Sequence, residues 1–210
     1  MQLVEAASWI GEMIDGFASS DAALLVGVAS QDPEDAGVPP EMQVGPVDPE
    51  GWVEWGVRPS AVEARDLDAL EADLGCALPT QLKAYLTSRA HLFEQVHSKR
   101  YGQLIMLPPL PTREPLRAFR ALLTGWLPLV RAGYLPFGEW GDGWGPMCID
   151  LGGVNADDGP VVWFDHERLI SLGEDTCARR DIVAPHSIEL YPSFVACLQD
   201  VFGVTPLAER

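Results

Sequence analysis

Apolar residues recur at helical spacing in five segments of the chain. The first segment is the clearest, because Leu3, Ile10 and Phe17 fall on one stripe with acidic residues elsewhere. The periodicity predicts helices over residues 3–17, 59–74, 80–86, 113–124 and 192–202. Gly75 stands where a left-handed C-cap ends a helix, and Thr80 is placed as an N-cap for the next one.

Short apolar runs between turn-forming residues predict the strands. They span residues 22–28, 51–57, 91–97, 102–107, 133–137, 146–151 and 160–165. Residues 29–51 are rich in proline, glycine and acids and predict an irregular loop. Glycine-rich turns at 138–145 and 152–159 favour an antiparallel meander. The elements therefore predict an α+β fold, in which helices cover one face of a mainly antiparallel sheet.

A division of the chain follows from the acidic loop. Residues 1–57 are predicted to form an N-terminal helix–strand extension with an acidic loop, packed on a main domain at 58–210. A free linker is not expected, because the run Gly-Trp-Val-Glu-Trp-Gly-Val at 51–57 is too hydrophobic to remain in solvent.

The charge is strongly acidic and unevenly spread. Fourteen Lys and Arg against 31 Asp and Glu give a formal net charge of −17. Residues 1–60 hold 11 acids and one base, residues 61–138 hold seven acids and nine bases, and residues 139–210 hold 13 acids and four bases. This balance argues against direct binding of nucleic acid or of an anionic membrane. It fits simple solubility and electrostatic attraction of a basic protein equally well.

The sequence patterns predict no targeting segment, no membrane span and no redox motif. No run of 18 apolar residues occurs, and acids stand near the start where a secretory signal would carry Lys or Arg. The cysteines form no CxxC pair and predict buried, unreactive thiols; they are Cys76, Cys148, Cys177 and Cys197. We therefore expect a cytoplasmic protein without a metal or another cofactor. Its oligomeric state is left open.

Three motifs approach ligand-binding or catalytic signatures, but each lacks an essential part. His166 and Glu167, predicted at a strand end, have no second histidine one helical turn further on, which a zinc protease needs. The glycine-rich run at 141–145 contains an acid and leads into a strand, so it predicts a turn and no phosphate loop. The Asp-Asp-Gly run at 157–159 predicts a tight hairpin, because the spaced ligands of a calcium loop are missing.

The tryptophans and arginines leave alternatives open. Trp140 and Trp144 lie in a glycine-rich acidic loop, where they either anchor a protein interface or fold back over the sheet. The other five tryptophans lie in periodic or strand segments and are predicted to be core residues; they are Trp9, Trp52, Trp55, Trp126 and Trp163. A helical stripe of Arg113, Arg117 and Arg120 is solvated, pairs with the acidic ends, or contacts RNA or an acidic partner.

Four motifs follow one another along the chain. They are Glu71-Ala-Asp-Leu-Gly-Cys-Ala-Leu-Pro79 with the helix after it, Leu135-Pro-Phe-Gly138 running into Cys148-Ile-Asp150, Val161-Val-Trp-Phe-Asp-His-Glu167, and Ser193-Phe-Val-Ala-Cys-Leu198. In this order they resemble the SMI1/KNR4 (SUKH) superfamily, over about residues 58–203. Two features depart from the family pattern. Thr87-Ser-Arg-Ala90 stands where members usually carry Asn-Gly, and residues 1–57 lie outside the pattern.

The resemblance implies a binding module and no enzyme. Bacterial members imply an immunity protein that neutralises a cognate polymorphic or secretion-system toxin, most often a nuclease, by occluding its active site. Eukaryotic relatives imply the alternative, a regulatory protein-interaction module without a toxin. A third possibility is an enzyme whose site includes Asp165, His166 and Glu167. The expected partner is a basic protein encoded by an adjacent gene, and the expected contact residues are Glu139, Trp140, Asp142, Trp144, Asp157, Asp158 and Glu167.

Overall fold

The computed structural model describes residues 2–20, 23–30, 37–153 and 157–203. Its helices are α1 (Leu3–Ala18), α2 (Ala64–Leu74), α3 (Thr80–Ser88), α4 (Arg117–Gly125), α5 (Leu127–Arg131), α6 (His166–Leu172), α7 (Glu174–Cys177), α8 (Arg180–Val183) and α9 (Phe194–Phe202). Single 3-10 turns lie at η1 (Pro40–Met42) and η2 (Ala184–His186). Parts of the predicted acidic loop and of the turn at 152–159, namely residues 31–36 and 154–156, fall outside the described residues.

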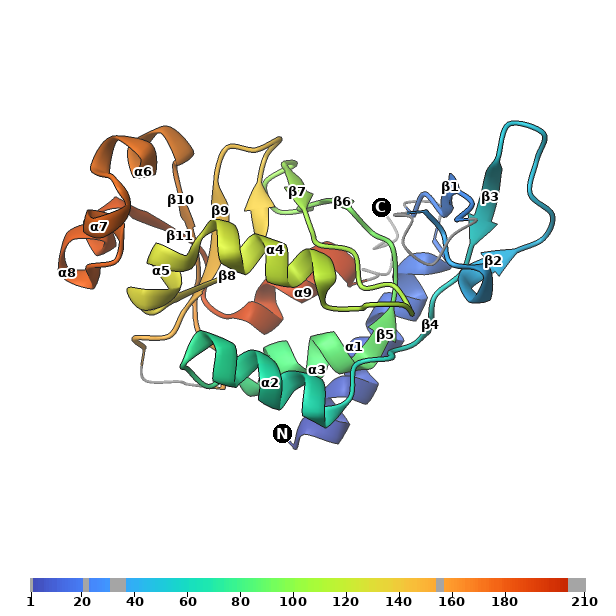
Figure 1. The fold of residues 1–210 in the computed structure, drawn as a ribbon, viewed down its shortest axis with the longest axis horizontal. Helices are drawn as coiled ribbons and strands as arrows, with labels where there is room; N and C mark the ends of the chain where they lie inside the picture. The colour runs from blue at the N-terminus through green and yellow to red at the C-terminus, as the bar shows by residue number, and fades with distance from the viewer. Residues whose placement is uncertain (1, 21–22, 31–36, 154–156, 204–210) are drawn as a thin grey trace, which may run out of the picture.

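The centre of the fold is a six-stranded antiparallel sheet in the order β11-β10-β9-β8-β7-β6 (Figure 1). Its strands are β6 (Gln95–His97), β7 (Leu104–Met106), β8 (Tyr134–Trp140), β9 (Pro146–Asp150), β10 (Val161–Phe164) and β11 (Ser187–Tyr191). Neighbours in the sheet follow one another along the chain, so the predicted meander is confirmed and extends further in both directions. The α+β fold class is confirmed as well.

Side chains on both faces of this sheet are buried, so the prediction of a single covered face was wrong. Consecutive residues of β8 alternate between two clusters: Leu135 joins a large core with α1, α3 and α9, whereas Tyr134 joins a smaller core with α5 to α8. Met147 and Cys148 of β9 divide in the same way. Because side chains alternate across a strand, the two clusters lie on opposite faces.

Two smaller strand pairings complete the fold. A three-stranded antiparallel sheet has the order β1-β3-β2, formed by β1 (Val26–Val28), β2 (Gln43–Val44) and β3 (Trp52–Trp55). It projects from one end of the molecule (Figure 1). The strands β4 (Arg58–Pro59) and β5 (Arg89–Ala90) form a separate pair. Pro59 therefore lies in a strand, and the helix predicted from this residue begins only at Ala64.

Local signals placed most helix ends correctly. Helix α1 covers the predicted span, and Gly75 ends α2 with φ at 69°, in the left-handed region that glycine tolerates. Thr80 is the first helical residue of α3, with Pro79 in the cap position. Helix α4 starts four residues later than predicted, at Arg117, after a turn in which Glu114 takes a positive φ of 46°.

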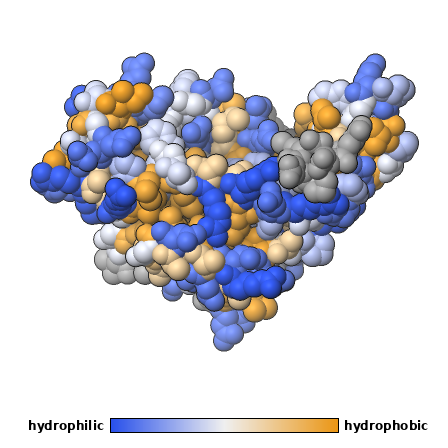
Figure 2. Space-filling view, viewed as in Figure 1, coloured by the Kyte–Doolittle hydropathy of each residue, from blue (hydrophilic) through white to orange (hydrophobic). Residues whose placement is uncertain are grey.

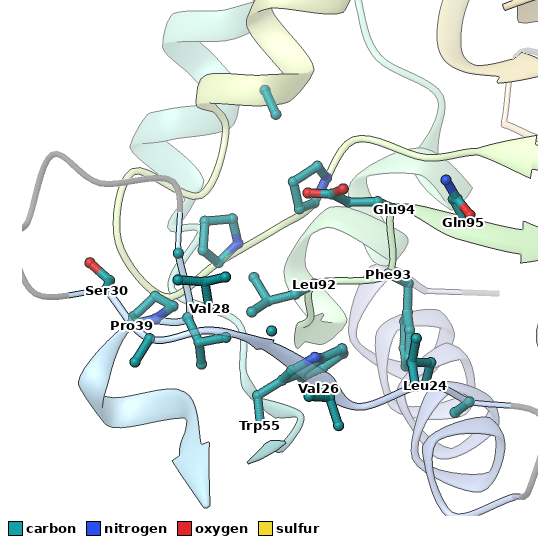
Figure 3. Close-up of a pocket in the computed structure, with 18 of the residues that line it drawn as sticks. Leu24, Val26, Val28, Ser30, Pro39, Trp55, Leu92, Phe93, Glu94 and Gln95 are labelled. Carbon is teal, nitrogen blue, oxygen red and sulfur yellow. The ribbon is translucent and has the colours of Figure 1, made fainter. Parts of the chain in front are cut away.

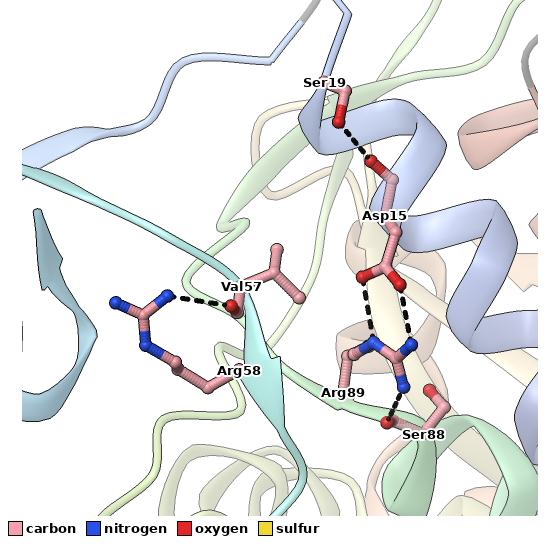
Figure 4. A network of polar contacts seen from close by, with 6 residues as sticks. All are labelled: Asp15, Ser19, Val57, Arg58, Ser88 and Arg89. Carbon is pink, nitrogen blue, oxygen red and sulfur yellow. Dashed lines mark hydrogen bonds and ion pairs between the residues drawn. The ribbon is translucent and has the colours of Figure 1, made fainter.

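An ion pair and an aromatic cluster join the N-terminal helix α1 to the segment that follows α3 and to α9. Arg89 donates from Nε and Nη2 to the two carboxylate oxygens of Asp15, at 2.8 and 2.6 Å, and from Nη1 to the Ser88 carbonyl (Figure 4). Phe17 of α1 packs edge-on against Phe93 and Phe202, with ring centroids 5.1 and 5.3 Å apart. The division of the chain at residue 57 stays a prediction.

Candidate binding surface

The turn between β8 and β9 is built from three glycines with positive φ. Gly141, Gly143 and Gly145 have φ at 66°, 75° and 139°. A Cβ on Gly145 would lie 2.0 Å from the carbonyl oxygen of Phe164, so only glycine lets the turn pack this closely against the end of β10. The turn is therefore fixed to the neighbouring strand.

The two tryptophans of this segment have different environments. Trp140, the last residue of β8, is 7% exposed and packs edge-on against Tyr101, with ring centroids 5.4 Å apart. Trp144 lies beyond the strand end and is 54% exposed. Its ring lies over Gly141, where a Cβ would come within 2.6 Å of it. Trp140 is thus a core residue, and Trp144 is a large apolar side chain held at the surface.

Helix α6 starts beside this turn. Asp165 is its N-cap and accepts a hydrogen bond from the Arg168 amide at 2.9 Å. The His166 amide donates to the Trp144 carbonyl at 2.9 Å, and the His166 ring contacts Trp126 edge-on with centroids 5.8 Å apart. His166 and Glu167 therefore open a helix, and their prediction as a strand end was wrong.

The structure divides the seven predicted contact residues between the two ends of β9. Asp142, Trp144 and Glu167 are exposed at the end that carries the turn, and half-buried Glu139 lies in β8 opposite Pro146. Trp140 lies at this end too but is buried. Asp157 and Asp158 follow the other end of the strand. The binding of a partner protein by these seven residues stays a prediction.

The two aspartates after β9 make contacts within the fold. Asp157 accepts from Thr80 Oγ1 at 2.6 Å, and its carbonyl accepts from the Gln81 amide at 3.1 Å. Asp158 accepts from the Val195 amide at 3.0 Å. These bonds attach the loop to the starts of α3 and α9.

We name the surface formed by Asp142, Trp144, His166 and Glu167 the turn surface.

Comparison with family models decides the family. The model described as the SMI1 / KNR4 family (SUKH-1) matches residues 61–199, more than half of the chain. The chain belongs to the SMI1/KNR4 (SUKH-1) family. The SUKH-1 match includes the whole turn surface and leaves out α1 and the β1-β3-β2 sheet. Comparison with curated proteins found no match for this SUKH-1 chain.

The arginine stripe of the SUKH-1 region pairs with acids. Arg113 Nε lies 2.9 Å from Glu41 in the N-terminal extension, and Arg117 Nη1 lies 3.1 Å from Glu114. Arg120 forms an ion pair with Asp73 of α2. Pairing with the acidic N-terminal segment is therefore confirmed for Arg113, whereas the acids that lie beside Arg117 and Arg120 belong to the middle segment, residues 61–138.

The thiols of this SUKH-1 protein are free. Cys148, Cys177 and Cys197 are buried as predicted, whereas Cys76 is half-buried. Burial raises the pKa of all four thiols, so at neutral pH each stays protonated and weakly nucleophilic. Within the described ranges, no group of three or more His, Cys, Asp or Glu side chains is placed to hold a metal ion. Across the same residues, no helix has the length and apolar character needed to cross a membrane.

Sequence patterns do not predict a surface role for His166, which belongs to the turn surface, or for Trp126, which lies beside it. The sequence raises only a catalytic or metal-binding role for His166 and a core position for Trp126, yet the rings of these two residues meet beside Trp144. A usable signal was present, because Asp165 followed by a charged, helix-favouring run is typical of an N-cap and the first turn of a helix.

Proposed function

We propose that this SUKH-1 protein is an immunity protein that binds a cognate toxin, most simply a basic nuclease, and occludes its active site. Membership of the family, over residues 61–199, is the observation that carries the proposal. The formal net charge of −17 adds to it, because a nuclease binds phosphates with a basic surface and an acidic protein is attracted to that same surface.

The turn surface supplies the kind of contact that such a complex needs. Trp144 offers a large, partly exposed ring on a turn that its glycines fix in place, and tryptophan is enriched among residues that dominate binding energy. Asp142 and Glu167 beside it are exposed acids that a basic partner neutralises on docking. An aromatic anchor with acids around it therefore fits a basic partner.

The experiment is co-expression with the product of the adjacent gene, scored by rescue of growth and by co-purification. Toxicity of the neighbour alone, rescue by this chain and a stable, salt-sensitive complex are expected. A neighbour that is harmless and does not co-purify would refute the proposal and favour a regulatory interaction module without a toxin.

A point variant tests the turn surface within the same complex. Trp144→Ala is expected to weaken binding at least tenfold, since truncation of a central tryptophan typically costs about 2 kcal/mol or more. Ile188→Ala is the matched control, because Ile188 is 52% exposed on the outer strand β11, and it should change affinity less than twofold. Equal affinities for the two variants would place the contact elsewhere and leave immunity itself intact.

A further inference from the structure

The β1-β3-β2 sheet presents apolar side chains on its outer face. In the antiparallel register, Val28 lies opposite Trp52, while Glu54 lies opposite both Val26 and Val44. Directly opposite residues share a face, so all five side chains point the same way. Val26, Val28, Val44 and Trp52 are 43, 53, 43 and 46% exposed. We name this set, with Glu54, the outer face.

Such a face departs from the usual pattern of an antiparallel sheet with one solvated side. The inward residues Val53 and Trp55 are 2 and 3% exposed, as expected for the side that meets the core. The solvated side would ordinarily be polar, yet it carries three valines and a tryptophan. Trp52, predicted to be a core residue, is therefore exposed. Figure 2 shows hydrophobic residues on this projecting lobe.

A groove of about 940 Å³ adjoins the outer face (Figure 3). Its lining includes Val26 and Val28 of β1 together with Leu92 and Pro109. The Leu25 carbonyl accepts from the Trp55 amide, so the next residue, Val26, directs its backbone groups away from β3. On the same edge of β1, the Val28 carbonyl accepts from the Val38 amide at 2.7 Å. The apolar surface thus continues from the outer face into the groove.

The charges around this surface select a basic occupant. Glu54 lies within the outer face, and Asp48 and Glu50 lie in the turn that leads into β3. Arg58, the one base among the first 60 residues, donates to the carbonyls of Glu41 and Val57. Arg113 and Arg117 also line the groove, where an acid accompanies each of them: Arg113 lies 2.9 Å from Glu41 and Arg117 lies 3.1 Å from Glu114. A second copy of the chain would bring like charges together, and nucleic acid would be repelled. A protein surface with an apolar centre and a basic rim complements this face.

We propose that the outer face and its groove are a docking surface for a basic protein, which is the toxin if the proposed function holds. The surface lies outside the SUKH-1 match at residues 61–199. It is therefore an addition of this chain to the family domain, and it makes the partner choice specific to this protein.

The test measures binding of the purified, catalytically inactivated product of the adjacent gene. The variant Val26→Thr/Val28→Thr/Trp52→Thr removes apolar surface while keeping residues that favour strands. At least a tenfold loss of affinity is expected relative to the unchanged chain. Ile188→Thr makes the same kind of change on the exposed outer strand β11 and should alter affinity less than twofold.

A single charge variant keeps the test valid if the triple variant fails to fold. Glu54 is exposed, so Glu54→Lys should leave the fold intact and weaken binding of a basic partner at least tenfold. Stronger binding, or affinities unchanged by both Glu54→Lys and the folded triple variant, would overturn this proposal while rescue of growth still supports immunity. A neighbour that neither kills cells nor binds overturns both. Dimerisation of the chain alone, abolished by the triple variant, would identify a second copy as the occupant and overturn the proposal too.

Discussion

Lowering the pH from 7.5 to 4.5 is expected to destabilise the folded protein through His91. This side chain is 0% exposed, and its Nε2 lies 3.0 Å from the Tyr85 hydroxyl. The Phe93 amide donates to its Nδ1 at 3.4 Å, which assigns the proton to Nε2 in a neutral ring. Burial lowers the pKa of His91 from 6.5 to about 3.

The sign and size of the effect follow from this pKa. The unfolded chain takes up a proton on His91 below about pH 6.5, whereas the folded protein does so only near pH 3. Between these values the unfolded state binds more protons, so the free energy of unfolding falls by about 1.4 kcal/mol for each pH unit. Two units below 6.5, at pH 4.5, the loss is about 3 kcal/mol. This is a substantial share of the total stability of an ordinary domain.

Comparison with His91→Gln isolates the contribution. Glutamine still hydrogen-bonds the Tyr85 hydroxyl but does not titrate, while the carboxylates titrate alike in both proteins. Urea unfolding at pH 7.5 and 4.5 should show that the unchanged protein loses about 3 kcal/mol more than the variant. Parallel losses would refute the reasoning. If the variant does not fold, an NMR titration of the His91 ring in the unchanged protein replaces the comparison. Protonation of this ring above pH 5 in the native state would equally refute the reasoning.

Two further predictions concern the attachment of the N-terminal helix and the thiols. Asp15→Asn removes the negative charge from the pair in which Arg89 donates two hydrogen bonds to Asp15. The free energy of unfolding in urea should fall by about 1 kcal/mol, a small value because the Asp15 side chain is 45% exposed and solvent screens the pair. An unchanged urea midpoint would contradict this role. A maleimide should label half-buried Cys76 before Cys148 and Cys197, as followed by mass spectrometry of peptides, and equal rates for all three would contradict their burial.

Short-range patterns predicted the β8-β9-β10 part of the meander well, because each of the two turns that join these strands carries its own glycine signal. These patterns did not predict which sheet faces are buried or where the short covering helices lie, because both depend on tertiary packing. The runs 134–138 and 146–149 are nearly continuous in apolar residues, a pattern typical of strands buried on both faces. The covering helices α5 to α8 are four to seven residues long, too short for periodicity to reveal them.

The tryptophans show what alternation could have added. In the run Trp52-Val-Glu-Trp55, Trp52 has the same parity as Glu54, and Trp55 has the parity of Val53. Strand geometry alone therefore assigns Trp52 to the polar side and Trp55 to the core, as the structure has them. No such rule separates Trp140 from Trp144, because their difference depends on where β8 ends and the turn begins.

The ion pairs shape the external field more than they stabilise the fold. Arg89, Arg113 and Arg120 of the mildly basic middle segment each meet an acid, and exposed pairs of this kind contribute only about 0–1 kcal/mol. Each pair does cancel a positive charge that would otherwise face a partner, so much of the field outside the protein comes from its two acidic ends. The outer face and the turn surface belong to these two ends, and each carries an exposed tryptophan, Trp52 or Trp144. Figure 1 places β1 and β3 at one extreme of the long axis and α6 at the other, so variants can weaken either contact without disturbing the other.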